Sequence, residues 1–405
     1  MATSLSPGIR LVVLSSALIN FGTYGVAPFL AVLMLRLHYS PIEVALVLGA
    51  NLVAARLVPL AAGLLGDRLA HVRVMIVSLV IRGAGLAGFA AHDDFWWFIV
   101  CSALVGLGGA GYEPNAYAVL AHEADEEVRA RGYALLNLGQ NIGATAGPVA
   151  GGVLIAFNTD ILFLVSGALM VVTAAVFLAY RDRLHTDSTD APVLSSLRRV
   201  FTDRRFLRFG VAMGLFWFID AQFQTSLPIY ATDLSGRVAL AGSVLVVNGI
   251  AGMLALLALR KQFEKRAALP MNAAGLLVVA VSMAAIALVP ELWWLLVCIA
   301  VYTIGETLVF VTADVYLAEL ADTRDAAAFF GGHDVFWAIG GTVGYFVGTA
   351  LLDAEAGNRA VWLVFAVAAL LALAVLGKDL RAGSGAPGKS PSPETAADTP
   401  ASTVN

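Results

Sequence analysis

Several ionisable side chains lie within strongly apolar stretches of the sequence. The acidic ones are Glu113, Asp220, Glu306, Asp314 and Asp334, and the basic ones are Arg56 and Arg82. A charge in the core of a bilayer costs at least ~2.5–3.5 kcal/mol on insertion scales, so such groups are usually paired or functional. Burial disfavours the ionised form of a carboxyl group and so lets it take up a proton near neutral pH. We therefore expect four of the acids to exchange protons: Glu306, Asp220, Glu113 and Asp334.

The two arginines need a partner at their own depth. Arg56, Arg82 and Glu113 are expected at similar depths in three neighbouring apolar stretches. We therefore expect Arg82 or Arg56 to form a buried ion pair with Glu113. This pair has either a structural or a functional role.

The composition excludes an ordinary soluble domain. Hydrophobic residues make up 59% of the chain and charged residues 13%, against about 45–50% and about 25% in soluble proteins. A membrane-spanning helix needs roughly 20 mainly apolar residues. The sequence predicts an all-α integral membrane protein with twelve such helices: 9–35, 42–65, 72–91, 96–120, 133–156, 160–180, 206–230, 239–259, 269–289, 292–319, 327–352 and 360–377.

Basic residues are distributed very unevenly between the two sides of these spans. The side that holds both termini receives twenty of the 25, the other side receives only Arg36, Arg237 and Arg359, and Arg56 and Arg82 lie within spans. Because Lys and Arg are retained on the cytoplasmic side, we expect both termini in the cytoplasm and the protein in the inner, or plasma, membrane.

The chain repeats itself. Asp94-Phe-Trp-Trp-Phe-Ile-Val-Cys101 recurs as Glu291-Leu-Trp-Trp-Leu-Leu-Val-Cys298, an offset of 291 − 94 = 197 residues that persists for dozens of positions. Two parallel homologous halves in an apolar chain are typical of transporters that rock one half against the other. The predicted units are a first six-helix half (1–180), a cytoplasmic linker (181–205), a second six-helix half (206–380) and a disordered cytoplasmic tail (381–405).

No nucleotide-binding loop, zinc motif or nucleophile elbow occurs in the sequence, so ATP-driven transport and hydrolysis have no residues to carry them. We expect no enzyme activity, no cofactor, no metal site and no nucleic acid partner.

The connection between the second and third spans reads Gly63-Leu-Leu-Gly-Asp67-Arg68-Leu-Ala-His-Val-Arg73. It resembles the cytoplasmic loop signature of the major facilitator superfamily, Gly-x-Leu-x-Asp-Arg-x-Gly-Arg-(Arg/Lys), although residues 70–72 depart from it. Gly63 would allow close helix approach, and Asp67 at a helix end would accept charge-assisted hydrogen bonds that close the cytoplasmic side. The resemblance implies a gating role for Gly63, Asp67, Arg68 and Arg73.

The fifth span contains Gly143-Ala-Thr-Ala-Gly147-Pro148-Val-Ala-Gly151-Gly152. This stretch matches Gly-x-x-x-Gly-Pro-x-x-Gly-Gly, a motif associated in that superfamily with drug/proton antiporters, so the resemblance implies export. Small residues four apart allow tight helix packing, and proline removes a backbone hydrogen bond. We expect Gly143, Gly147, Pro148 and Gly151 to govern conformational switching, with a plain packing face as the alternative.

In this superfamily the first, fourth, seventh and tenth spans line the cavity. The resemblance thereby places Glu113, Asp220 and Glu306 around one site, and Tyr302-Thr-Ile-Gly-Glu306 resembles the acidic tenth span of multidrug/proton antiporters. The residues expected to line a substrate cavity are Asn20, Tyr24, Trp217, Phe223, Gln224, Tyr302 and Trp337.

The resemblance implies a monomeric transporter driven by the proton gradient, which expels a small hydrophobic or amphiphilic compound across the lipid bilayer. Proton-coupled or facilitated uptake of a small solute is an alternative. A membrane receptor or scaffold that transports nothing is a more remote one.

Overall fold

The computed structural model describes residues 7–65, 71–121, 126–180, 200–320, 326–353 and 360–383, and every regular element in these ranges is a helix. The first half contains α1 (Pro7–Arg36), α2 (Pro41–Leu65), α3 (His71–Gly88), α4 (Phe95–Ala121), α5 (Glu126–Phe157) and α6 (Thr159–Tyr180). The second contains α8 (Arg204–Asp220), η2 (Ala221–Phe223), α9 (Ser226–Ser235), η3 (Val238–Leu240), α10 (Ser243–Lys265), α11 (Ala268–Ile286), α12 (Leu292–Leu320), α13 (Ala326–Asp353) and α14 (Ala360–Gly383). The all-α expectation is confirmed.

Ten stretches of the described residues are long and apolar enough to cross a membrane, and α8, η2 and α9 together form one of them. The two remaining predicted spans correspond to α3 and α5. Helix α3 contains Arg73 and Arg82, while α5 contains several charged and amide side chains. These residues make the two helices less apolar than a typical span.

The helix bounds repeat at the offset seen in the sequence. Helices α4 and α12 begin at residues 95 and 292, which again gives 292 − 95 = 197. Even a tertiary hydrogen bond is repeated: the Trp97 indole donates to the Gly88 carbonyl at 2.7 Å, and the Trp294 indole donates to the Ala285 carbonyl at 2.8 Å. The two halves thus share local geometry as well as helix order.

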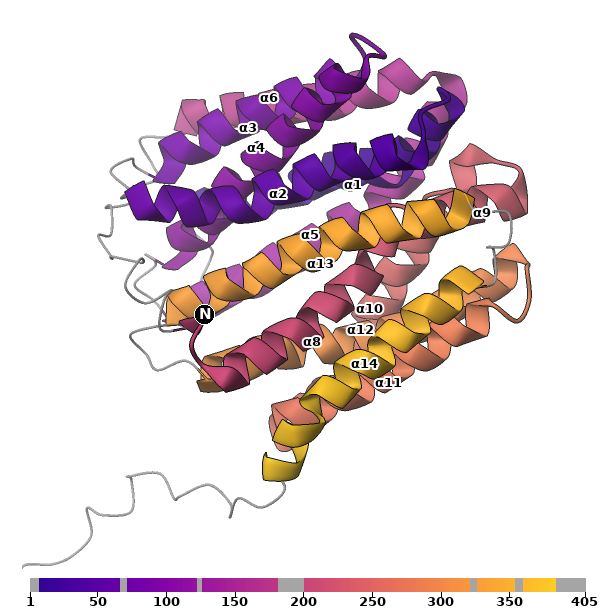
Figure 1. Cartoon of the computed structure of the whole chain (residues 1–405). Helices are drawn as coiled ribbons and strands as arrows, with labels where there is room; N and C mark the ends of the chain where they lie inside the picture. Colours follow the sequence, from indigo (N-terminus) through magenta and orange to yellow (C-terminus); the bar gives the residue numbers. More distant parts are fainter. Residues whose placement is uncertain are drawn as a thin grey trace, which may run out of the picture.

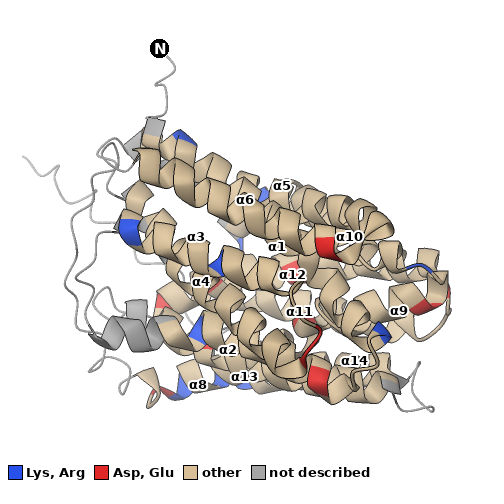
Figure 2. Cartoon of the chain, turned by 90° about the horizontal axis from the view of Figure 1, so that it is seen from above, with Lys and Arg blue, Asp and Glu red and all other residues tan. Residues whose placement is uncertain are grey.

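The helices lie roughly parallel, in two groups that correspond to the halves of the sequence (Figure 1). Helices α2 and α5 of the first group contact α13 and α10 of the second. Charged residues are sparse over the helices (Figure 2), and many large apolar side chains, such as Leu257 and Val281, are exposed on them. Such a surface is suited to lipid rather than water.

Three of the glycines of the fifth span, Gly143, Gly147 and Gly151, hold α5 against α1 within the first half. A Cβ atom at Gly143 would lie 2.2 Å from the Ala17 carbonyl oxygen, and one at Gly147 would lie 2.4 Å from that of Phe21. Gly151 meets the carbonyl of Gly25 in the same way. These glycines therefore join two helices of one half rather than the two halves.

Helices α13 and α8 repeat this contact in the second half. A Cβ atom at Gly340 would lie 2.1 Å from the Gly214 carbonyl oxygen, and one at Gly344 would lie 2.4 Å from that of Phe218. The buried Gln222 side chain, in the 3-10 turn between α8 and α9, donates to the Gly344 carbonyl at 3.0 Å. This bond fixes the break in the seventh span against α13.

The two halves contact each other at one end of the bundle and, nearer its middle, between α2 and α13. At the end opposite the termini, which we call the far end, Gly152 of α5 faces the carbonyl of Ala239, and Pro148 faces Gly242. The buried core of the first half also continues into the second through Ile229. Tight packing at this level indicates that the far end is closed.

Parts of several predicted features lie outside the described residues. These are Asp67 and Arg68, residues 181–199 of the linker and residues 384–405 of the tail. Gly63 belongs to α2, and Arg73 is exposed in the first turn of α3.

Replacing Gly147 by Leu is expected to lower the stability of the whole protein, because the new side chain would collide with the Phe21 carbonyl oxygen. Overpacking typically costs about 1–3 kcal/mol. The matched control is Gly377→Leu, since a Cβ atom at Gly377 meets nothing within 4 Å. Thermal unfolding in detergent should show a lower midpoint for Gly147→Leu alone, and equal midpoints for the two variants would contradict this packing account.

Candidate functional site: a two-chambered cavity between the halves

Two adjoining chambers occupy the middle of the protein between the halves. The large chamber has a volume of about 620 Å³ and is lined mainly by α5, α8, α10, α12 and α13. The small chamber has a volume of about 320 Å³ and is lined mainly by α1, α2, α3, α4 and α13. Both volumes lie within or near the usual range of small-molecule sites. The wall between the chambers is formed by residues that line both: Tyr24, Trp217, Asp220, Phe223, Gln224, Asp334 and Trp337.

Most of the predicted site residues are brought together here. Glu306 lines the large chamber, and Asn20, Arg56, Arg82 and Glu113 line the small one. Asp314 and Phe330, both exposed, lie at the part of the large chamber nearer the termini. The large chamber therefore extends towards that end, opposite to the closed far end.

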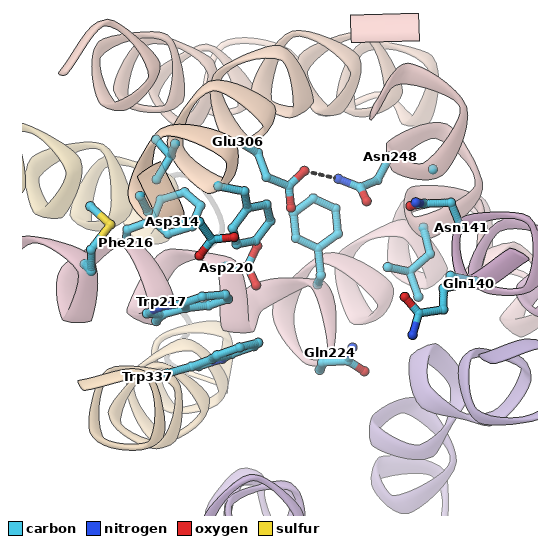
Figure 3. A pocket seen from close by; sticks show the side chains of 18 of the residues that line it. Gln140, Asn141, Phe216, Trp217, Asp220, Gln224, Asn248, Glu306, Asp314 and Trp337 are labelled. Atoms are coloured by element: carbon cyan, nitrogen blue, oxygen red, sulfur yellow. Dashed lines mark hydrogen bonds between the residues drawn. The ribbon is translucent and has the colours of Figure 1, made fainter. Parts of the chain in front are cut away.

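A cluster of polar side chains surrounds Glu306 in the large chamber. The Asn248 amide donates both to the Glu306 carboxyl group and, at 3.0 Å, to the Thr303 hydroxyl. Asp220 lines the same chamber as Glu306, and a direct hydrogen bond between the two carboxyl groups would require a proton on one of them, since an ionised carboxylate only accepts. Figure 3 shows Glu306 with Asn248 beside Asp220.

Tyr302 contacts this cluster from the protein core rather than from the chamber. Its side chain is fully buried and lines neither chamber, and its hydroxyl donates to Asp220 Oδ1 at 3.5 Å. The expectation that Tyr302 itself lines the cavity is therefore wrong, because the aromatic ring packs on Phe223 with its centroid 5.2 Å away. Tyr302 instead orients one of the acids.

An aromatic and charged stack divides the two chambers. The indoles of Trp217 and Trp337 are parallel with their centroids 3.6 Å apart (Figure 3). The Arg56 guanidinium carbon lies 3.2 Å from the centroid of the Trp337 ring, so it must occupy the face of that ring that Trp217 leaves open. Arg56 Nη1 is also 3.8 Å from Asp334 Oδ1. Because Arg56 belongs to α2 and its partners to α8 and α13, this stack joins the two halves.

The expected ion pair with Glu113 is not formed in this conformation. Arg56 pairs with Asp334 instead, since α2 contacts α13 of the second half as well as α4 of its own half. Arg82 lines the same chamber as Glu113, but no ion pair joins the two, and its Nε and Nη1 atoms have no hydrogen-bond partner.

Amide side chains are the part of the site that sequence reasoning missed. Asn137, Gln140 and Asn141 of α5 line the large chamber together with Asn248 of α10. A signal was present, because three amides within five residues form a polar stripe at helical spacing in an otherwise apolar span. Without the structure, nothing showed that this stripe faces the acids of the other half.

A helical bundle of two homologous halves, with a polar cavity between them and an apolar outer surface, defines a membrane transport protein. Comparison with known proteins supports this class. The sequence model of the Major Facilitator Superfamily matches residues 12–331, and the chain therefore belongs to that superfamily, as expected from the motifs.

Curated relatives match nearly the whole chain. Multidrug resistance protein MdtH of Salmonella newport (strain SL254) is 25% identical over 378 residues, which covers 91% of this chain and 93% of the relative. MdtH of Salmonella heidelberg (strain SL476) matches to the same extent.

Solved structures share the fold. The POT family transporter PepTSo has a TM-score of 0.79 at 15% identity and covers 93% of this chain and 98% of its own. A point mutant of the nucleoside transporter NupG has a TM-score of 0.76 at 12% identity and covers 91% of this chain and 99% of its own.

Loss of Arg56 is expected to loosen the contact between α2 and α13. A Cβ atom at Gly49 would lie 3.3 Å from the Thr342 side chain across that contact, so Gly49→Cys with Thr342→Cys should cross-link readily once Cys101 and Cys298 are replaced. Adding Arg56→Gln should slow cross-linking about threefold or more, as the loss of a cation–π contact suggests. Adding Arg36→Gln, outside both chambers, should not. An unchanged rate with Arg56→Gln would show that the stack does not hold the halves together.

Proposed function

We propose that this transporter exports a small hydrophobic or amphiphilic compound in exchange for protons. The observation that carries the proposal is the pair of buried acids, Asp220 and Glu306, in a cavity between two halves that pack tightly at the far end. The relatives named as multidrug resistance proteins and the motif in α5 support export rather than uptake.

The orientation follows from the basic residues of the described ranges. Arg and Lys gather at the end of the bundle that holds both termini, for example at Arg204, Arg260 and Lys378, whereas Arg36 and Arg237 lie at the far end. Retention of basic residues in the cytoplasm supports cytoplasmic termini in a plasma membrane. In that orientation the conformation described here faces the cytoplasm, from which an exporter takes its substrate.

The acid pair offers a simple means of coupling. Two adjacent, largely buried carboxyl groups favour sharing a proton, because two neighbouring carboxylates would repel each other. The amide of Asn248 stabilises an ionised Glu306 by donating to it. A substrate that supplies its own donor or positive charge would replace the proton, and a proton arriving from the other side would later release the substrate. The protein would then change between its inward-open and outward-open conformations only when either a proton or a substrate is bound at the acid pair.

The aromatic wall suits the proposed substrate class. Phe216, Trp217, Phe310 and Trp337 line the large chamber and pack against one another, and aromatic surfaces of this kind bind flat apolar groups with little demand for one shape. The amides of α5 add hydrogen-bonding groups that either donate or accept. We propose that the protein acts as a monomer, since both chambers lie within one chain.

Uptake of a small solute is the alternative function. The solved structures that share the fold include peptide and nucleoside transporters, and likeness in fold does not distinguish the direction of transport. Accumulation of dyes and antibiotics in cells with and without the protein, repeated after the proton gradient is collapsed, separates the two functions. Export predicts lower accumulation that is lost with the gradient, and uptake predicts higher accumulation.

Glu306→Gln is expected to abolish gradient-driven efflux while the protein is still made and still binds substrate, because Gln imitates the protonated acid and cannot release a proton. Asp220→Asn is expected to have the same effect. Glu319→Gln is the matched control, since Glu319 is an exposed acid on the same helix, α12, that lines neither chamber. Dye efflux from energised vesicles measures the difference, and pumping at the parental rate by Glu306→Gln would remove Glu306 from the coupling mechanism.

A further inference from the structure

The small chamber contains a buried guanidinium group that the protein leaves without a partner. Arg82 is only 8% exposed, and its Nε and Nη1 atoms are buried without a hydrogen bond. No ion pair or hydrogen bond joins Arg82 to another described residue. Buried polar groups are nearly always satisfied, and an unpaired buried charge is strongly unfavourable. The unpaired guanidinium of Arg82 therefore points to a bound ligand as its partner.

Two glycines of α4 position this guanidinium at the chamber. A Cβ atom at Gly108 would lie 2.5 Å from Cβ of Arg82, and one at Gly109 would lie 3.4 Å from its Nη1. The arginine stem therefore lies against bare backbone, and the guanidinium extends along α4. Arg82 and Gly109 both line the small chamber, so the guanidinium lies at the wall of that chamber.

The surroundings of Arg82 suit a ligand that is anionic at one end and apolar at the other. Leu30, Leu86 and Phe89 line the same chamber and offer an apolar surface. A guanidinium binds a carboxylate through parallel, charge-assisted hydrogen bonds, which are stronger than neutral ones.

Glu113 is the competing partner inside the chamber. It lies four residues after Gly109, one helical turn along α4, and lines the same chamber without forming an ion pair with Arg82. An anionic ligand at Arg82 would therefore be repelled by an ionised Glu113, and removal of that charge would strengthen its binding. This relation gives a test that leaves Arg82 itself unchanged.

We propose that the small chamber binds the carboxylate of an aromatic or aliphatic acid at Arg82. The proposal rests on the proposed function, because a site in the cavity between the halves is a transport site, and it narrows the substrate class to amphiphiles with an acidic group. The apolar part of such a ligand lies towards Phe89, and any further donor on it faces the acids of the large chamber.

The test is equilibrium binding of 2-naphthoate to the purified full-length protein in detergent, measured by calorimetry without any proton gradient. The neutral isostere 2-naphthamide serves as the matched ligand. The parent is expected to bind naphthoate at least about tenfold more tightly than naphthamide, and Arg82→Gln is expected to lose that preference while Arg82→Lys keeps part of it. Arg266→Gln, an exposed arginine outside both chambers, should bind like the parent.

Glu113→Gln keeps the proposal testable if Arg82→Gln does not fold, and it is expected to tighten naphthoate binding several-fold without changing naphthamide binding. The proposal is overturned if the parent shows no preference for naphthoate, if Arg82→Gln retains the preference, or if Glu113→Gln leaves it unchanged. Because binding is measured without transport, these outcomes are independent of whether the protein exports, imports or couples to protons.

Discussion

The free-energy cost of burying a charged side chain among apolar helices is the constraint on which the rest of this structure depends. Each ionisable side chain that the sequence places within a span must find a partner or a polar cavity, because neither lipid nor a packed core solvates it. In this protein these groups lie around the cavity between the two halves. Arg56 pairs with Asp334 there, Asp220 and Glu306 both line the large chamber, and Arg82 lines the small one. Polar chemistry is thereby confined to the surface along which the halves would move.

The packing within each half complements this arrangement. Helix α5 lies on α1, and α13 on α8, through glycines that admit backbone contact at matching positions of the two repeats. Contacts this close leave little freedom within a half. Between the halves, the tight contacts at Gly152 and Pro148 lie at the far end, and the stack around Trp337 lies at the level of the cavity. Stiff halves joined by limited contacts are what rigid-body rocking requires.

Sequence reasoning predicted the fold well, because length, hydropathy and an internal repeat each determine it almost independently. The offset of 197 recurs between the starts of α4 and α12, and the acids expected near one site, Glu113, Asp220 and Glu306, line two adjoining chambers. Partner choice was predicted poorly. Arg56 pairs across the halves with Asp334 rather than within its half with Glu113, and this depends on helix contacts that no local pattern encodes.

The glycine motif gives a similar lesson. Spacing by four predicted a close helix contact but left its partner open, and the structure shows that Gly143, Gly147 and Gly151 contact α1 while Pro148 and Gly152 face the other half. Residues from one motif thus serve different interfaces. The amides of α5 were visible as a stripe in the sequence, yet their relation to Glu306 required the three-dimensional arrangement of α5, α10 and α12.

The central claim is that the halves rock around the acid pair, and distances between spin labels at the two ends of the bundle test it most directly. One label pair would join the far ends of the halves, at Leu37 and Arg237, and the other their termini-side ends, at Arg73 and Lys261, all of which are exposed, whereas both native cysteines are buried. The account predicts two populations at each end whose distances change in opposite directions, with proportions that depend on pH in the parent and not in Glu306→Gln. Distances that stay constant, or that lengthen together at both ends, would contradict it.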